Sequence, residues 1–144
     1  MPGWRRGAVL IVAVVGLTGC TSGGRSLASD PTALSPVGPT WRLVSIDSQP
    51  VLAGTAVTAQ FTSENRVSGS AGCNGYSGTA RAGAGRLSVG VMSSTLMACE
   101  PEAVMAQEGR YLSVLQVATS YTMDGGELRL GRSAADATLV FTSR

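Results

Sequence analysis

The stretch of sequence that decides the fold is residues 66–79, RVSGSAGCNGYSGT. Glycine recurs in it at every third position: 69, 72, 75 and 78. In strands, glycine is typical of bulges, tight corners and points where two backbones approach closely. A phosphate-binding loop is a poor match, because no strand leads through these glycines into a helix and the motif's lysine is missing. We therefore predict a sharply curved pair of strands that a disulfide at Cys73 holds in place.

Short segments with alternating apolar residues lie on both sides of this motif. They are residues 55–61, 87–91, 121–123, 128–130 and 139–141, and residues 41–46 form a further segment that is apolar and β-prone on both faces. Leu87, Val89 and Val91 are expected to share one face, because a period of two residues is typical of antiparallel strands with one wet face. Turn residues separate the segments, and Asp124-Gly125-Gly126 is a hairpin candidate. The sequence thus predicts a mainly β fold built on an antiparallel sheet.

The segment that follows Pro101 has a helical period instead. Proline suits the first turn of a helix, where its missing N–H costs nothing. An apolar stripe then recurs at spacings of seven, four and three residues: Val104, Tyr111, Leu115 and Ala118. We predict one amphipathic helix of about 17 residues with its apolar face on the sheet. Gly109 inside it either marks a close approach to a strand or costs about 1 kcal/mol relative to alanine without a purpose.

The first twenty residues have the pattern of an export signal. Arg5 and Arg6 precede the apolar run AVLIVAVVGL of residues 8–17, which is shorter than the roughly 20 residues that a membrane-spanning helix needs. The following LTGC, residues 17–20, resembles the lipobox of bacterial lipoprotein precursors. That resemblance implies that residues 1–19 are a signal peptide and that Cys20 receives a diacylglycerol lipid. The alternatives are an ordinary secretory signal or a short uncleaved anchor, and general secretion fits better than twin-arginine export.

Cleavage before Cys20 changes what the composition means. Removal of 19 residues from 144 leaves 125, enough for one domain with its own core. Residues 20–38 are rich in Gly, Ser, Pro and Thr and are predicted to be a flexible tether, with the domain at 39–144. All eleven basic residues are arginines, and the two in the leader account for the formal charge of +2. The mature chain is then neutral, and we expect no nucleic-acid partner.

The cysteines Cys73 and Cys99 remain once the lipid has used Cys20. Export to an oxidising compartment favours a disulfide between them. It would close a loop of 27 residues, a constraint worth about 3.5 kcal/mol of loop entropy. The alternative is a copper(I) site, because two thiolates and the thioether of Met97 are the soft ligands that this ion prefers. We expect the disulfide, with no bound metal and no cofactor.

Catalytic side chains are scarce in this sequence. Histidine and lysine are both absent, which removes the commonest general base and the amine nucleophile. A carboxylate-based hydrolase stays open as an alternative, although nothing in the spacing of the carboxylates pairs them. The candidates are Asp47, Glu64, Glu108 and Asp136.

Asn74 and Glu108 form a candidate polar site, structural or functional. Glu108 lies on the apolar stripe of the predicted helix, and buried carboxylates are usually paired. We therefore expect it to bind an arginine or Asn74, and a role in a pocket is the alternative. Asn74 is predicted to be a turn residue whose side chain caps the local backbone, with a ligand contact as the alternative.

A set of motifs along the chain resembles the META/HslJ-like domain of bacterial envelope proteins. They occur in the order Trp41-x-Leu43, residues 67–78 (VSGSAGCNGYSG), residues 94–99 (STLMAC), Glu108-x-x-Tyr111-x-x-x-Leu115 and Leu128-x-Leu130. The resemblance covers about residues 39–144, and Leu96 stands where the family often has arginine. It implies a compact, barrel-like and partly open antiparallel sheet with one helix packed on it. It also implies an association with envelope stress and heat shock.

These observations predict a non-enzymatic lipoprotein. The lipid on Cys20 would anchor it to the cell membrane, facing the extracytoplasmic side. Its domain would bind an envelope protein or a small ligand, or support the envelope under stress. The copper(I) site and the hydrolase remain the alternatives.

Overall fold

The computed structural model describes Met1 and residues 35–143. The predicted signal peptide, Cys20 and most of the predicted tether lie outside the described residues. The strands are β1 Thr40–Ile46, β2 Gln49–Pro50, β3 Thr58–Thr62, β4 Arg66–Ser70, β5 Gly75–Gly83, β6 Arg86–Ser94, β7 Ser120–Asp124, β8 Glu127–Ser133 and β9 Asp136–Thr142. One helix, α1 at Glu102–Val117, lies between β6 and β7 in the chain. No helix within the described residues combines the length and the apolar character that a membrane span requires.

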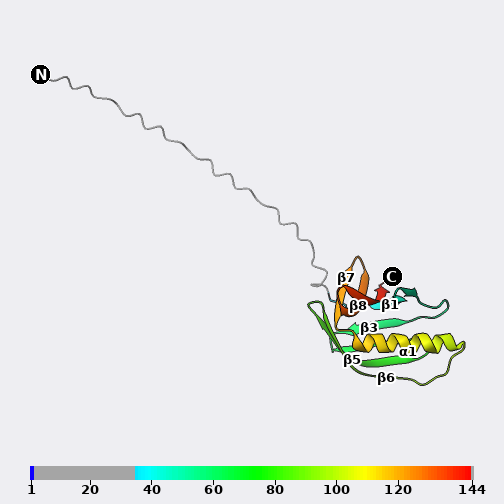
Figure 1. Cartoon of the computed structure of the whole chain (residues 1–144). Coiled ribbons are helices and arrows are strands. Elements are labelled where there is room, and N and C mark those ends of the chain that lie inside the picture. Colours follow the sequence, from blue (N-terminus) through cyan, green and yellow to red (C-terminus); the bar gives the residue numbers. More distant parts are fainter. Residues whose placement is uncertain (2–34, 144) are drawn as a thin grey trace.

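The nine strands form one antiparallel sheet that curves into a ring (Figure 1). Their order is β2-β1-β3-β4-β5-β6-β7-β8-β9, and β1 also pairs with β9, which closes the ring. The ring is weakest between β6 and β7, which share the single residue pair Arg86–Ser120. Helix α1 packs on the sheet against β6, β8 and β9. The predicted fold class, a mainly β antiparallel sheet with one helix packed on it, is confirmed.

Residues 66–79 form a pair of strands with the disulfide-bonded Cys73 in the corner between them. β4 pairs with β5 antiparallel, from Arg66 opposite Thr79 to Ser70 opposite Gly75. A side chain at Gly69 would collide with the backbone oxygen of Thr58 on β3. Glycine is therefore required here because two backbones approach too closely for a Cβ atom.

The predicted hairpin at residues 124–126 is also confirmed. Asp124 of β7 pairs with Glu127 of β8, and Gly125 and Gly126 between them have φ angles of 55° and 87°. Two consecutive positive φ angles are the backbone of a two-residue hairpin whose twist matches that of the flanking strands. Glycine adopts these angles without steric cost.

The prediction for Val91 is wrong. Leu87 is buried and Val89 is half-buried, but Val91 is 86% exposed, and its neighbour Met92 packs against the core instead. The pairing of β5 with β6 shifts its register between Gly78 and Ala80. An irregularity of this kind moves every later side chain to the other face of the strand.

Helix α1 has the predicted position and the predicted buried face. Its buried residues are Val104, Glu108, Tyr111 and Leu115. Tyr111 and Leu115 join a continuous core with residues from the strands, among them Phe61 and Phe141. Gly109 is exposed and a Cβ atom there would meet nothing within 4 Å, so no strand approaches it.

Candidate functional site

The carboxylate of Glu108 is the centre of a buried polar network. Glu108 is 6% exposed and points from α1 toward the corner between β4 and β5. Its Oε2 accepts hydrogen bonds from the backbone N–H groups of Asn74, at 2.7 Å, and Cys73, at 3.2 Å. Its Oε1 accepts a third from Nδ2 of Asn74, at 2.7 Å. Three donors therefore hold one buried carboxylate, as burial of such a group requires.

Asn74, which is 1% exposed, uses its whole side chain in the same network. Its Nδ2 also donates to the backbone oxygen of Met97, at 3.1 Å. Its Oδ1 accepts from the backbone N–H of Met97 and from the hydroxyl of Thr95, both at 2.7 Å. Asn74 thus joins α1, the β4–β5 corner and the loop after β6. The predicted contact between Glu108 and Asn74 is present, but the prediction that Asn74 caps the local backbone is wrong, because the backbone groups that its side chain binds belong to Met97, 23 residues along the chain.

The expected disulfide joins Cys73 to Cys99, with 6.0 Å between their Cα atoms. It ties the loop after β6 to the same corner that Asn74 holds. In this form the two sulfur atoms bind each other and offer no thiolate to copper(I). The described residues also contain no group of three or more His, Cys, Asp or Glu side chains that could hold a metal ion.

Two tyrosines form a second buried polar contact, which the sequence reasoning missed. The hydroxyl oxygens of Tyr76 on β5 and Tyr111 on α1 lie 2.6 Å apart, and Tyr76 donates to the backbone oxygen of Thr58 at 3.0 Å. Burial raises the pKa of Tyr76, although the hydrogen bond with Tyr111 opposes this. Burial and the neighbouring Tyr76 raise the pKa of Tyr111 as well. The sequence did offer one indication of this contact: Tyr111 lies on the predicted buried stripe, and a buried tyrosine hydroxyl needs a hydrogen-bond partner.

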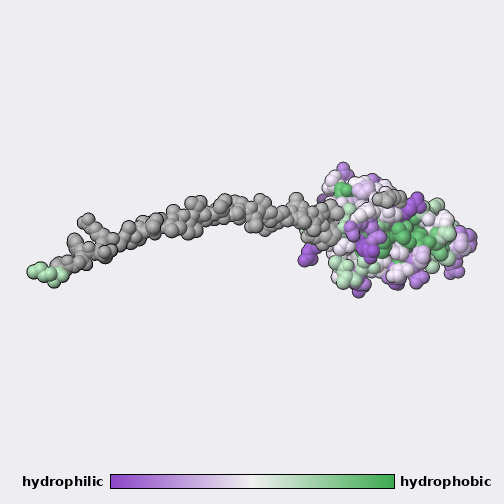
Figure 2. All heavy atoms as spheres, turned by 90° about the horizontal axis from the view of Figure 1, so that it is seen from above, coloured by the Kyte–Doolittle hydropathy of each residue, from purple (hydrophilic) through white to green (hydrophobic). Residues whose placement is uncertain are grey.

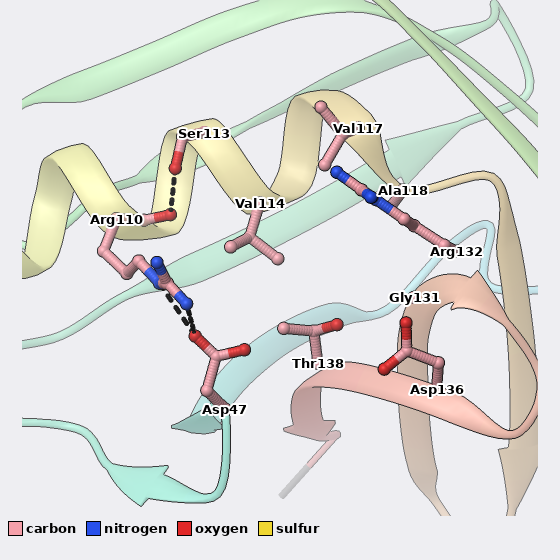
Figure 3. Close-up of a pocket in the computed structure, with 10 residues that line it drawn as sticks. All are labelled: Asp47, Arg110, Ser113, Val114, Val117, Ala118, Gly131, Arg132, Asp136 and Thr138. Carbon is pink, nitrogen blue, oxygen red and sulfur yellow. Dashed lines mark hydrogen bonds and ion pairs between the residues drawn. The ribbon is translucent and has the colours of Figure 1, made fainter.

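A cleft of about 420 Å³ lies on the other side of α1, facing β8, β9 and the turn after β1 (Figure 3). Val114 and Val117 contribute the apolar part of its wall. Arg110 donates its Nε–H to Oδ2 of Asp47, at 2.7 Å, and this pair closes one end. Within residues 35–143, neither charged side chain at the other end, Arg132 or Asp136, is in an ion pair. The cleft therefore carries two positive and two negative side chains.

Distortions of the β8–β9 pair shape this end of the cleft. The register shifts on both sides of Gly131, where a Cβ atom would collide with the backbone oxygen of Asp136. Such bulges bend a strand and redirect the side chains that follow. Thr119, just after α1, anchors the bend, because its N–H donates to the oxygen of Gly131 at 2.9 Å and its hydroxyl to the oxygen of Arg132 at 2.8 Å.

The structure separates the four candidate carboxylates into different environments. Asp47 and Asp136 line the same cleft, because the backbone N–H of Asp47 donates to the oxygen of Thr138 on β9, at 2.8 Å. Glu64 is exposed in the turn between β3 and β4, and Glu108 lies in the buried network. The prediction that nothing in their spacing pairs them holds along the chain, but the closure of the ring brings two of them together.

The surface also carries apolar side chains. Figure 2 shows hydrophobic residues gathered on one face of the domain, with hydrophilic residues beside them. A smaller hollow of about 310 Å³ lies between the β2 region and α1, lined largely by apolar atoms that include those of Leu52 and Ala106. Leu96 is 96% exposed.

Fold and site together define a small, mainly β domain, in which a ring of antiparallel strands carries one helix and a disulfide braces a buried polar network. The chain belongs to the META domain family, whose sequence model matches residues 33–144. Comparison with curated proteins found no match.

Solved structures share this fold at low sequence identity. An NMR structure of a protein from Burkholderia xenovorans is 24% identical, with a TM-score of 0.58 over 76% of this chain and 83% of that one. A second NMR structure is 22% identical, with a TM-score of 0.58 over 73% and 88% of the two chains. The crystal structure of a DUF4847 family protein from Bacteroides vulgatus is 15% identical, with a TM-score of 0.53 over 76% and 94%. At these identities, the likeness concerns the fold alone.

Proposed function

We propose that this META domain protein is a lipoprotein of the bacterial envelope, anchored through Cys20 and facing the extracytoplasmic side. In this proposal its domain acts without catalysis, by binding a small ligand or an envelope protein when the envelope is under stress. The observation that carries the proposal is the environment of Glu108. Three protein donors engage this buried carboxylate, which supports a role in the architecture of the domain and thereby the part of the proposal that excludes catalysis.

The anchoring part of the proposal is supported by the sequence and by the disulfide. A short apolar run ending in LTGC is typical of lipoprotein precursors, and disulfides persist in oxidising compartments outside the cytoplasm. The bond between Cys73 and Cys99 fits that location. The Gly- and Ser-rich residues after Cys20 would let the domain reach a partner near the membrane surface.

Fractionation and mass spectrometry of the wild type, Cys20→Ala and the matched control Thr21→Ala test the anchor. We expect the wild type and T21A to sediment with membranes and to carry a diacylglycerol mass on an N-terminal cysteine. C20A should lack that mass and leave the membrane fraction. An unlipidated wild type, or a C20A variant that stays with membranes as the wild type does, would rule out the anchor.

The binding role is tested in the cell that makes this protein. We expect a deletion strain to grow normally without stress and poorly under heat or detergent. Expression of the wild-type chain in this strain should restore growth under stress. A deletion with no stress phenotype, together with no partner recovered from crosslinked membranes, would contradict the proposed role.

A hydrolase is the second candidate, and the shared cleft of Asp47 and Asp136 is the observation that favours it. Asp47 is already paired with Arg110, which weakens it as an acid or a base. We expect the purified chain to release no product from cell-wall glycan or peptide, as measured by mass spectrometry. Turnover that Asp136→Asn abolishes would establish the enzyme instead.

The copper(I) alternative is tested by intact mass after alkylation in denaturant. We expect a mass lower by two hydrogens and no alkylated thiol at Cys73 or Cys99, in agreement with the disulfide. Two alkylated thiols in the protein as isolated would reopen the metal site.

A further inference from the structure

We propose that the cleft between α1 and the β8–β9 pair binds a small zwitterion: an amino acid or short peptide with a free ammonium and a free carboxylate. The inference rests on the proposed binding role and names the class of ligand for it. The volume of the cleft, about 420 Å³, lies within the range of small-molecule sites. A dipeptide is a ligand of suitable size, because two residues span about 7 Å at most.

The charges of the cleft select the class of ligand. Arg110 and Asp47 neutralise each other at one end. At the other end, Figure 3 shows the guanidinium of Arg132 and the carboxylate of Asp136 entering the cleft from neighbouring strands, without a bond between them. A purely anionic ligand would meet Asp136, and a purely cationic one would meet Arg132. A ligand with one charge of each sign satisfies both.

Arg132 and Asp136 have opposite roles in this assignment. A guanidinium presents parallel N–H donors that match the two oxygens of a carboxylate. The Asp136 carboxylate accepts from the ammonium, which carries donors and no acceptor. The methyl groups of Val114 and Val117, on the face of α1 toward the cleft, leave an apolar wall for the ligand's side chain.

The wall that carries Arg132 is held in place before any ligand arrives. The two hydrogen bonds of Thr119 tie the end of α1 to the bulge at Gly131 and Arg132. Gly131 permits the close approach of β8 to the backbone of Asp136 on β9. A binding group on a rigid support loses less conformational entropy when the ligand binds.

Calorimetric titration of the full chain, purified from membranes in detergent, tests the assignment. The probes are the dipeptide Ala-Val, its N-acetyl form and its C-terminal amide. We expect Ala-Val to bind, and each blocked form to bind about tenfold more weakly, because each loses one charged hydrogen-bonding group.

Variants connect each end of the ligand to one residue. Arg132→Gln should bind Ala-Val and its amide equally, and Asp136→Asn should bind Ala-Val and its N-acetyl form equally. The matched controls Arg129→Gln on β8 and Asp124→Asn on β7 change the same charges outside the cleft and should bind all three probes as the wild type does. Circular dichroism confirms that each variant is folded.

No heat of binding at about 10 mM Ala-Val, or equal affinity for the three probes, would overturn the proposal. Loss of binding with the amide but not with the N-acetyl form would also overturn it, in favour of a site for simple carboxylates. Mass spectrometry of the same preparation shows whether Cys20 carries the lipid, so the anchor is tested independently of ligand binding. A lipidated chain that does not bind refutes the zwitterion site and leaves the anchor in place.

Discussion

Glu108 is the residue through which the helix and the sheet depend on each other. Its two oxygens accept from Asn74 and Cys73 and have no contact with the cleft that Figure 3 shows. A network of this kind is stabilising when every member is satisfied and costly when one is not. The burial of Glu108 on the apolar face of α1 is therefore explained by its hydrogen bonds to the corner between β4 and β5.

Replacing Glu108 by Gln should destabilise the fold by about 2–4 kcal/mol. The new NH₂ group would face an N–H donor in either orientation of the amide, and the negative charge that strengthens the bonds would be gone. Urea denaturation measures the loss. Glu64→Gln, in an exposed turn, is the matched control and should change stability by less than about 0.5 kcal/mol. A stable E108Q protein that fails to restore growth of the deletion strain under stress would instead assign Glu108 a functional role.

The Tyr76–Tyr111 pair should make stability depend on alkaline pH. Both pKa values are raised above the usual 10.0 by burial, so the folded protein keeps its protons where the unfolded chain loses them. Stability is then fully present below pH 10 and falls above it, by about 1.4 kcal/mol per pH unit for each tyrosine. Urea denaturation between about pH 8 and pH 11.5 measures the slope. The double variant Y76F/Y111F should lack this part of the slope, and an unchanged slope would contradict the assignment.

At the scale of the element, α1 carries a glycine that its packing does not need. Gly109 is exposed, and a Cβ atom added there would meet no other atom within 4 Å. Gly109→Ala should therefore raise the free energy of unfolding by about 1 kcal/mol through helix propensity alone. Thermal and urea denaturation both report it.

The contrasting variant is Gly69→Ala on β4. The same added methyl group would collide there with the backbone of Thr58, and we expect a loss of about 1–3 kcal/mol. Equal effects at the two positions would mean that the backbone approach between β3 and β4 is not what requires glycine at 69.

At the scale of the whole molecule, α1 contacts strands on both sides of the weakest junction in the ring. β6 and β7 share one residue pair, and α1 packs against β6 on one side and β8 and β9 on the other. Leu115, fully buried on α1, belongs to the core that fills the ring. The helix thus packs against strands that lie on both sides of the weak junction and contributes to the core.

Leu115→Ala should cost about 2–5 kcal/mol and should accelerate amide exchange in β6 and β7 more than in β4 and β5. Leu115 lies in the last turn of α1, and the end of this helix lines a hollow together with the start of β6, whereas β4 and β5 pair over five residues. Val117→Ala, at a half-exposed position of the same helix, is the control and should cost less than about 1 kcal/mol. Uniform acceleration across all strands would argue against a weak junction.

The sequence alone determined most of the elements. Alternation predicted the strands, although β3 begins at Thr58 and not at residue 55, and helical spacing predicted the buried face of α1. These patterns are local, because the face a side chain takes depends on its near neighbours. The pairing of Cys73 with Cys99 followed from counting cysteines, which also needs no structure.

The glycines of residues 66–79 predicted a pair of strands with a tight corner, held by a disulfide at Cys73. Only the tertiary structure decided which backbone they approach, that Asn74 and Glu108 satisfy each other, and that Tyr76 meets Tyr111. It also decided that Val91 faces the solvent and that Asp47 shares a cleft with Asp136. The physical reason is that bulges and the closure of a ring join residues far apart in the chain, and no local period records those contacts.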